Sequence, residues 1–165
     1  MKRMVSRTER LLDAVGRYLK KSLDDARAGW NVKDEGLGLP AVAMCHHGYC
    51  DPVNGLPLYP ALILIVNGRD SSIPFFVEYD ITVGLAVKSE DMAALVRWGQ
   101  AYEDILEDAL DCDHSLGGSV LDINGQRMDN DIVSGTYLVT VACKVQVDRG
   151  GFVYAENGYG ATVDA

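Results

Sequence analysis

The sequence lacks any long hydrophobic run. Its longest unbroken apolar stretch is Ala61 to Val66, whereas a helix needs about 20 apolar residues to span a bilayer. The first ten residues are dominated by charged and polar side chains and contain no apolar segment of a secretory signal. We therefore expect a protein that has no membrane contact and is not secreted through a standard signal.

Basic residues are also scarce. The 165 residues hold 24 acids against 15 bases, a net charge of −9, and a surface of that sign repels phosphate groups. This balance argues against general nucleic-acid binding. Apolar residues make up 48% of the chain and charged residues 24%, which is ordinary globular usage and predicts one folded domain rather than disorder.

Cysteines are few, and their spacing does not predict a disulfide framework, so we interpret them as reduced intracellular thiols. They are Cys45, Cys50, Cys112 and Cys143. Two histidines lie between Cys45 and Cys50, but a structural zinc site needs a second pair of ligands, which only Cys112 and His114 could supply. We expect an ordinary strand and turn here, with a metal site as the alternative.

Motifs of catalysis are missing as well. The chain contains no G-x-S-x-G, no phosphate-binding G-x-x-x-x-G-K, no G-x-G-x-x-G opening a helix after a strand and no H-E-x-x-H. A nucleophilic pair of Cys45 or Cys50 with His114 has no support from spacing. The sequence therefore predicts no enzyme, no catalytic residue, no metal and no cofactor.

Two amphipathic helices are predicted. Ser6 to Glu9 matches a capping box, and apolar residues then recur at three-to-four spacing as far as Leu23, with Gly29 as the expected stop. The second helix is expected to be capped by Ser89 and carries an apolar stripe that runs to Leu110. Loops are expected over residues 28–40 and 48–57 because both are rich in glycine, proline and asparagine.

Strands are predicted between and after the helices. Strict alternation marks residues 77–88 and 137–147, and a nearly continuous apolar run marks residues 58–66. Residues 41–46 are a weaker candidate. A short strand over residues 119–123 is expected to end in a hairpin turn at Asn124-Gly125, with a polar, mobile link to residue 135.

These elements predict an α+β fold, a mostly antiparallel sheet with two helices packed on one face. The domain is expected to occupy residues 1–148. Residues 149–165 are predicted to form a flexible C-terminal tail that contains glycine and tyrosine.

Charge is distributed unevenly along the chain. Residues 1–27 hold eight bases and four acids, whereas residues 89–131 hold eleven acids and two bases. This asymmetry indicates head-to-tail contact between copies, or contact with differently charged partners; two solvated helix faces are the alternative. An acidic surface that lines a pore would also let duplex DNA pass without binding it.

Several segments follow one another in a distinctive order. The run Leu58-Tyr59-Pro60-Ala61-Leu62-Ile63-Leu64 precedes an alternating strand, Asp80 to Val87. The next helix ends in Leu110-Asp111-Cys112-Asp113-His114-Ser115-Leu116-Gly117-Gly118, before Val120 to Ile123 and the strand Tyr137 to Val147. Over roughly residues 5–148, this order resembles that of the tail terminator (tail completion) proteins of tailed bacteriophages.

The resemblance implies a structural virion protein with an α+β fold. Such proteins form a homohexameric ring that caps the tail tube, stops its polymerisation and docks the tail to the head connector. The implied partners are other copies of the chain, the tail tube protein and the head–tail connector protein, while genomic DNA passes through without specific binding. The implied location is the tail or neck of the virion, and the host cytoplasm during assembly.

Two alternatives stay open. One is another virion protein, either a head–tail adaptor or a tail-tube subunit. The other is a small-molecule-binding or metal-binding α+β domain that uses the region from Cys45 to Cys50.

Candidate subunit or lumen contacts follow from charge and position on the first helix, the second helix and the link after it. They are Arg10, Arg17, Lys20 and Lys21; Glu103, Asp104, Glu107, Asp108 and Asp111; and Asn124, Gly125, Arg127, Asp129 and Asp131. The carboxylates do not have the spacing of a calcium-binding loop.

Overall fold

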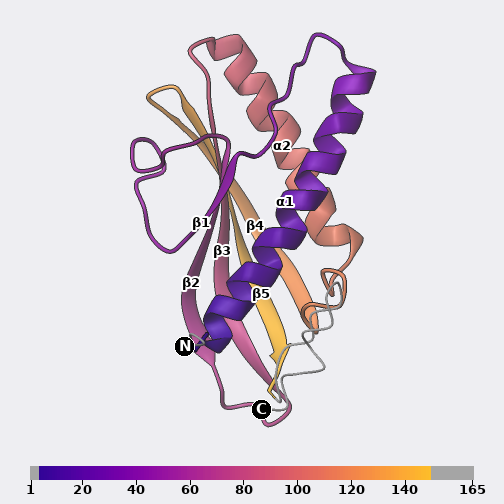
Figure 1. Cartoon of the computed structure of the whole chain (residues 1–165), viewed down its shortest axis with the longest axis vertical. Coiled ribbons are helices and arrows are strands. Elements are labelled where there is room, and N and C mark those ends of the chain that lie inside the picture. The colour runs from indigo at the N-terminus through magenta and orange to yellow at the C-terminus, as the bar shows by residue number, and fades with distance from the viewer. Residues whose placement is uncertain (1–3, 150–165) are drawn as a thin grey trace.

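A computed structural model describes residues 4–149 of the chain. Its centre is a five-stranded sheet in the order β1-β2-β3-β5-β4, in which β1 pairs parallel to β2 and all other neighbours are antiparallel (Figure 1). The strands are β1 (Met44–His47), β2 (Ala61–Asp70), β3 (Phe76–Lys88), β4 (Asp122–Val133) and β5 (Thr136–Asp148). The predicted α+β class with a mostly antiparallel sheet is confirmed.

The central pair, β3 and β5, forms because both strands alternate apolar and polar residues over their whole length. Their register places Val77 opposite Val147 and Val83 opposite Val141. The alternate residues therefore form continuous rows on one face, and all of these apolar side chains are buried. The two predicted inward faces are confirmed.

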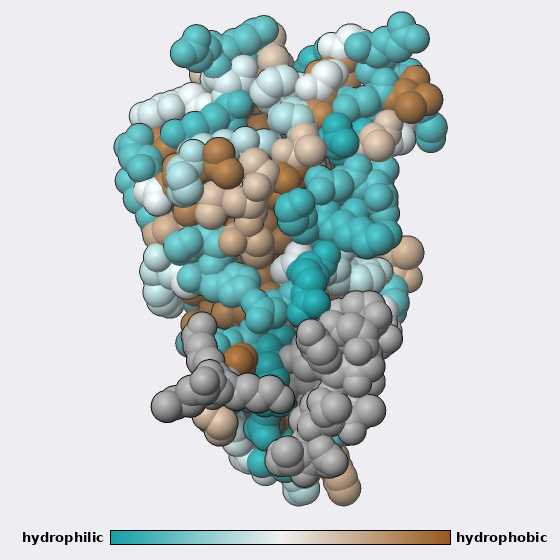
Figure 2. Space-filling model, in the orientation of Figure 1, coloured by the Kyte–Doolittle hydropathy of each residue, from teal (hydrophilic) through white to brown (hydrophobic). Residues whose placement is uncertain are grey.

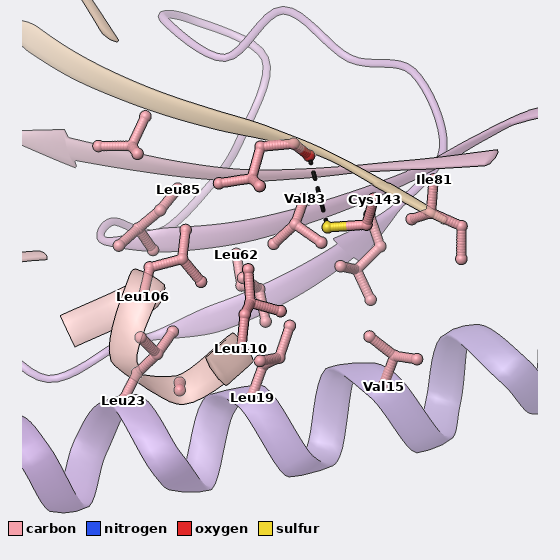
Figure 3. Close-up of a cluster of buried hydrophobic side chains, with 14 of the residues drawn as sticks. Val15, Leu19, Leu23, Leu62, Ile81, Val83, Leu85, Leu106, Leu110 and Cys143 are labelled. Carbon is pink, nitrogen blue, oxygen red and sulfur yellow. Dashed lines mark hydrogen bonds between the residues drawn. The ribbon is translucent and has the colours of Figure 1, made fainter. Parts of the chain in front are cut away.

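Both helices cover that same face, as predicted (Figure 1). Helix α1 (Arg7–Lys33) contacts β1 and β2, whereas helix α2 (Met92–Cys112) contacts β3, β5 and β4. Figure 3 shows Leu19 and Leu23 of α1 beside Leu106 and Leu110 of α2, on one face of the sheet. Neither these helices nor any other between residues 4 and 149 is long and apolar enough to cross a membrane.

The helix ends differ in part from the prediction. Ser6 caps α1 as expected, since its hydroxyl accepts a hydrogen bond from the Glu9 N–H. The helix does not stop at Gly29, which lies in open space, but continues to Lys33. Helix α2 is capped by Asp91 rather than Ser89; the Asp91 carboxylate accepts from two backbone N–H groups, and Ser89 instead accepts from the N–H of Asp91.

The largest correction concerns β4. The predicted hairpin at Asn124-Gly125 does not exist, because the strand continues for 12 residues to Val133 and turns at Ser134-Gly135. Both turn residues have positive φ, 48° and 75°, as a tight two-residue hairpin requires. The register shifts between Gly125 and Arg127, so the asparagine–glycine pair marks a β-bulge instead of a turn. The link predicted to be mobile is therefore a paired edge strand.

The first two strands also shift against their predicted bounds. β1 lies at residues 44–47 instead of 41–46, and β2 continues through a bulge at Val66/Gly68 instead of ending there. On the face away from the helices, Ala61, Ile63 and Ala86 form a small second cluster with Leu56. The predicted C-terminal tail, apart from Arg149, lies outside the described residues.

Candidate assembly surfaces

The basic candidates are all on α1, but they differ in their contacts. Lys20 and Lys21 pair with Asp24 and Asp25 one turn later, at 3.2 and 3.0 Å between nitrogen and oxygen. Arg17 is exposed and Arg10 is half-buried. Figure 2 shows hydrophilic side chains along the outward side of this helix. Because such exposed pairs are weak and screened by salt, these cations keep the capacity to contact a partner.

The acidic candidates are on α2, and four of them are exposed to solvent. They are Asp104, Glu107, Asp108 and Asp111. They follow the helical spacing that places them opposite the buried stripe. The predicted acidic surface is therefore present, with one exception.

The exception is Glu103, which is half-buried and binds the sheet. Its Oε1 accepts hydrogen bonds from the Tyr137 hydroxyl at 2.6 Å and from the Asn130 amide at 2.7 Å. Burial, followed by the hydrogen bond and negative charge of Glu103, raises the pKa of Tyr137. Glu103 thus connects α2 to β4 and β5, and sequence reasoning missed this because both partners are distant in the chain.

The third group of candidates lies along β4, the edge of the sheet. All five residues are exposed, and the Arg127 Nε lies 3.1 Å from the Asp129 carboxylate. The bulge at Gly125 faces α2, where a small hollow of about 130 Å³ is lined by Glu107 and Asp111 on one side and by residues 125–128 on the other. Helix α2 and strand β4 therefore adjoin at this hollow, and both carry more acids than bases.

The basic and acidic candidates do not come together within one molecule. Helix α1 lies over β1 and β2, and α2 lies over β3, β5 and β4. Counted over each element, α1 holds seven bases and four acids, α2 one base and five acids, and β4 one base and three acids. Opposite charges are thus sorted to two different surfaces of the domain, which we call the basic side (α1) and the acidic side (α2 and β4).

The two cysteines of the segment Cys45 to Cys50 lie on opposite faces of the sheet. Cys45 packs into the main core and Cys50 into the small cluster on the other face. Burial, and after it the charge of Asp13, raises the pKa of Cys45 to about 11, so its thiol stays protonated at neutral pH and is a poor nucleophile. The second predicted ligand pair is separate, since Cys112 is exposed at the end of α2 and His114 faces Asp122 at 3.5 Å.

No metal cluster forms between residues 4 and 149: within that range, no group of three or more histidine, cysteine, aspartate or glutamate side chains is arranged to hold an ion. His47 and Asp13 approach within 3.9 Å beside Cys45, below α1 at Gly16. A Cβ at Gly16 would lie 3.0 Å from the Cys45 sulfur, so α1 and β1 are in close contact at this point. A hollow of about 250 Å³ beside the contact is lined by Asp13, Gly16, Arg17, Lys20, Cys45 and His47.

No family model and no curated protein matches this sequence. Among solved structures, a chain described as "Virion of native gene transfer agent (GTA) particle" aligns over 70% of this chain and 86% of its own length, with 13% identity and a TM-score of 0.38. Similarity of this size does not establish a common function, so the function has to follow from the surfaces of this chain.

Proposed function

We propose that this chain is a structural virion protein of a tailed bacteriophage, a tail terminator. In this proposal, copies form a ring that caps the tail tube, stops its polymerisation and docks the tail to the head connector. The ring acts in the tail or neck of the virion and assembles in the host cytoplasm. The proposal assigns the chain no catalytic residue, metal or cofactor.

The observation that carries the proposal is the sorting of charge to two different surfaces, bases to α1 and acids to α2 and β4. A contact between the basic side of one copy and the acidic side of the next uses two different surfaces, so it is heterologous and continues from copy to copy. Such a series closes into a ring where the rotation between copies closes, and a hexamer is the closure that the family resemblance implies. Complementary charge favours this pairing and disfavours contact between like sides.

The order of elements adds support. Tyr59-Pro60 leads directly into β2, and α2 leads through Leu116-Gly117-Gly118 towards β4. β5 is a long inner strand of the sheet. These are the segments on which the resemblance to tail terminators rests. A net charge of −9 suits a lumen through which DNA passes, because phosphates are repelled rather than bound.

Electron microscopy of the purified, untagged full chain at high concentration tests the proposal. Closed rings of about six subunits with a central hole are expected, because rotational closure distinguishes a cap from a filament. Long tubes would identify a tail-tube subunit instead. Small particles alone, at every protein concentration, would contradict self-assembly of a ring.

A charge reversal identifies the contact. The double variant Glu107→Lys with Asp111→Lys should abolish the rings, since both side chains are exposed on the acidic side. Glu103 is left intact because it binds Tyr137. The matched control is Glu90→Lys, an exposed residue that precedes α2, and it should leave the rings unchanged. Rings that persist in the double variant would rule out this acidic surface as the contact.

A further inference from the structure

Among residues 4–149, the two edges of the sheet are strands that pair on one side only. At one edge, the four residues of β1 pair with β2, and at the other edge, the 12 residues of β4 pair with β5. Helix α1 contacts β1, and helix α2 contacts β4. A contact between the basic side of one copy and the acidic side of the next therefore brings these two edges together. An edge strand presents backbone N–H and C=O groups that can pair with another strand.

In β1, the backbone groups of Cys45 and His47 point out of the sheet. The carbonyl of Leu64 accepts a hydrogen bond from the N–H of Gly48, directly after β1, although the register pairs Leu64 with His47. In a parallel ladder, this offset means that the even-numbered residues of β1 bond to β2. Backbone groups alternate between the two sides of a strand, so the odd-numbered residues direct theirs outward.

In β4, the backbone groups of Met128 and Asn130 point outward. The N–H of Ile132 is taken by the side chain of Asp131 at 2.9 Å, so the phase of the ladder to β5 leaves the even-numbered residues after the bulge facing outward. The side chains of these residues lie on the helix side of the sheet, since Met128 packs against the main core and Asn130 binds Glu103 of α2. The outward residues of β1 also have their side chains on the helix side, so the two edges match.

The register across the sheet places β1 and β4 at the same level. Counted along the paired rows, residues 44–47 of β1 are level with residues 128–131 of β4. Because β1 is parallel to β2 and three antiparallel steps lead from β2 to β4, β1 and β4 are antiparallel. Copies related by the rotation of a ring keep the same sense along its axis. β4 of the next copy therefore meets β1 in the antiparallel sense. One such row consists of His46, Ile63, Gly84, Thr140 and Asp129.

Side chains on the face without helices complement each other in this alignment. His46 and Asp129 lie opposite as a pair without backbone hydrogen bonds, in which the Cα atoms are about 4.5 Å apart. The His46 imidazole can donate to the Asp129 carboxylate, whose pair with Arg127 is exposed and therefore weak. Pairing of β4 with β4 of another copy would instead bring the carboxylates of Asp129 and Asp131 together, and like charges on facing strands are unfavourable.

We propose that β1 of one copy pairs with β4 of the next as antiparallel strands, with residues 44–47 opposite residues 128–131. Backbone hydrogen bonds join the outward residues of both strands, and His46 binds Asp129 across the contact. The five-stranded sheet then continues from copy to copy around the ring. The cysteine and histidines of β1 thus belong to an assembly edge. This inference rests on the proposed ring and names the strands that join its copies.

Hydrogen exchange of the unaltered full chain tests this pairing by comparing rings with single copies separated by size-exclusion chromatography. The amides of Cys45, His47, Met128 and Asn130 should exchange at least about tenfold more slowly in the rings. The amide of Ser72, which lies between β2 and β3, is the control and should not change. Rings in which the four amides exchange as in single copies would overturn the pairing and leave the ring proposal standing. Absence of rings at every concentration would contradict both.

Disulfide trapping between two variant chains tests the register. One chain carries His46→Cys and the other Asp129→Cys, and both carry Cys112→Ser to remove the exposed native thiol. Rings from an equal mixture should give linked dimers on oxidation, because the paired Cα atoms lie within disulfide range. A mixture in which the first chain keeps His46 should give none, which excludes a link through Cys45.

The matched control for the register replaces Asp129→Cys by Val133→Cys. This position is on the same face of β4 but four residues farther along the strand, so it should give few links with His46→Cys. Equal yields from both mixtures would contradict the proposed register. Dimers in rings of the Asp129→Cys chain alone would indicate contact of β4 with β4 and would overturn the pairing.

Discussion

The two helices pack on the same face of one sheet, yet their outer sides carry opposite charge. Both bury a stripe of leucines in the same core, so the inner residues of α1 and α2 are set by the same requirement for apolar packing. Outward, α1 is rich in arginine and lysine while the second half of α2 is rich in carboxylates. Folding does not require this difference, since the carboxylates oppose the helix dipole. The proposed contact between copies uses this difference.

One glycine of each helix has very different surroundings, and substitutions at these two positions give the largest expected difference in stability. A Cβ at Gly99 of α2 would lie 2.3 Å from the Tyr137 ring, whereas a Cβ at Gly29 of α1 would meet nothing within 4 Å. Gly99→Ala should lower the free energy of unfolding by about 1–3 kcal/mol through overpacking. Gly29→Ala should raise it by up to about 1 kcal/mol because alanine favours helix. Urea denaturation measures both, and equal effects would contradict the difference in packing.

The hydrogen bond between Glu103 and Tyr137 gives the next largest expected effect. Tyr137→Phe removes the hydroxyl that binds the Glu103 carboxylate at 2.6 Å and should lower the free energy of unfolding by about 1–2 kcal/mol. Tyr49→Phe is the matched control, because its exposed hydroxyl makes a long contact of 3.4 Å with Asn67. It should change stability by less than about 0.5 kcal/mol. An unchanged free energy of unfolding in Tyr137→Phe would mean that the hydrogen bond does not hold Glu103 and that this carboxylate is available on the acidic side.

The rate of alkylation should differ between the cysteine under α1 and the cysteine at the end of α2. Cys45 lies below α1 at Gly16, while Cys112 is exposed at the end of α2. Iodoacetamide at about pH 8 should modify Cys112 first and Cys45 only after denaturation, because the reactive species is an accessible thiolate. Mass spectrometry of the alkylated peptides gives the order. Equal rates at both positions would show that α1 does not protect the strand below it.

The raised pKa of Cys45 also predicts a pH dependence of stability. Its pKa of about 11 in the folded state exceeds the ordinary thiol value of 9.0, so the folded state holds the proton more tightly than the unfolded state. This contribution is fully present below pH 9 and is lost as pH rises towards 11. The unfolding free energy should therefore fall above pH 9, and Cys45→Ala should flatten that fall. Identical slopes in both proteins would contradict burial of this thiol.

The smallest effect is expected for the exposed ion pairs of the basic side. Lys21 and Asp25 approach at 3.0 Å on the surface of α1, and such a pair contributes about 0.2–0.5 kcal/mol. Asp25→Ala should therefore change the unfolding free energy slightly, and less at high salt. The same substitution frees Lys21 for a partner. Thermal denaturation at low and high salt measures the effect, and a loss above about 1 kcal/mol would place this pair in a larger network.

The core of the fold was predictable because its signals are local and repeated. The alternation of apolar residues predicts which face of β3 and of β5 is buried. The leucine spacing predicts the buried side of α1 and of α2 in the same way. Strand β4 was missed for the opposite reason. Its side chains are nearly all exposed, so apolar alternation is weak, and the bulge near Gly125 shifts the phase between Ile123 and Met128. The asparagine–glycine pair then predicted a turn, whereas the strand continues through a bulge at this point.

The sequence predicted the distribution of charge on the candidate surfaces, but not the contacts between them. The sorting of bases to α1 and of acids to α2 follows directly from the sequence, whereas the union of α2 with β4 depends on the sheet order. Glu103 has the same charge as Glu107 and Asp111, and the spacing of four residues places all three along one side of α2. Only the packing of Tyr137 and Asn130 against it, 34 and 27 residues away, distinguishes it from them.

A charge-swap mixture tests the central claim, contact between the basic and acidic sides, most directly. One variant carries Arg17→Glu and Lys21→Glu, and the other carries Glu107→Lys and Asp111→Lys. Each variant alone places like charges at every contact and should form no rings in electron micrographs. An equal mixture should restore rings, because each acidic copy can then alternate with a basic one. Rings from either variant alone, or none from the mixture when the unaltered chain forms them, would contradict the account.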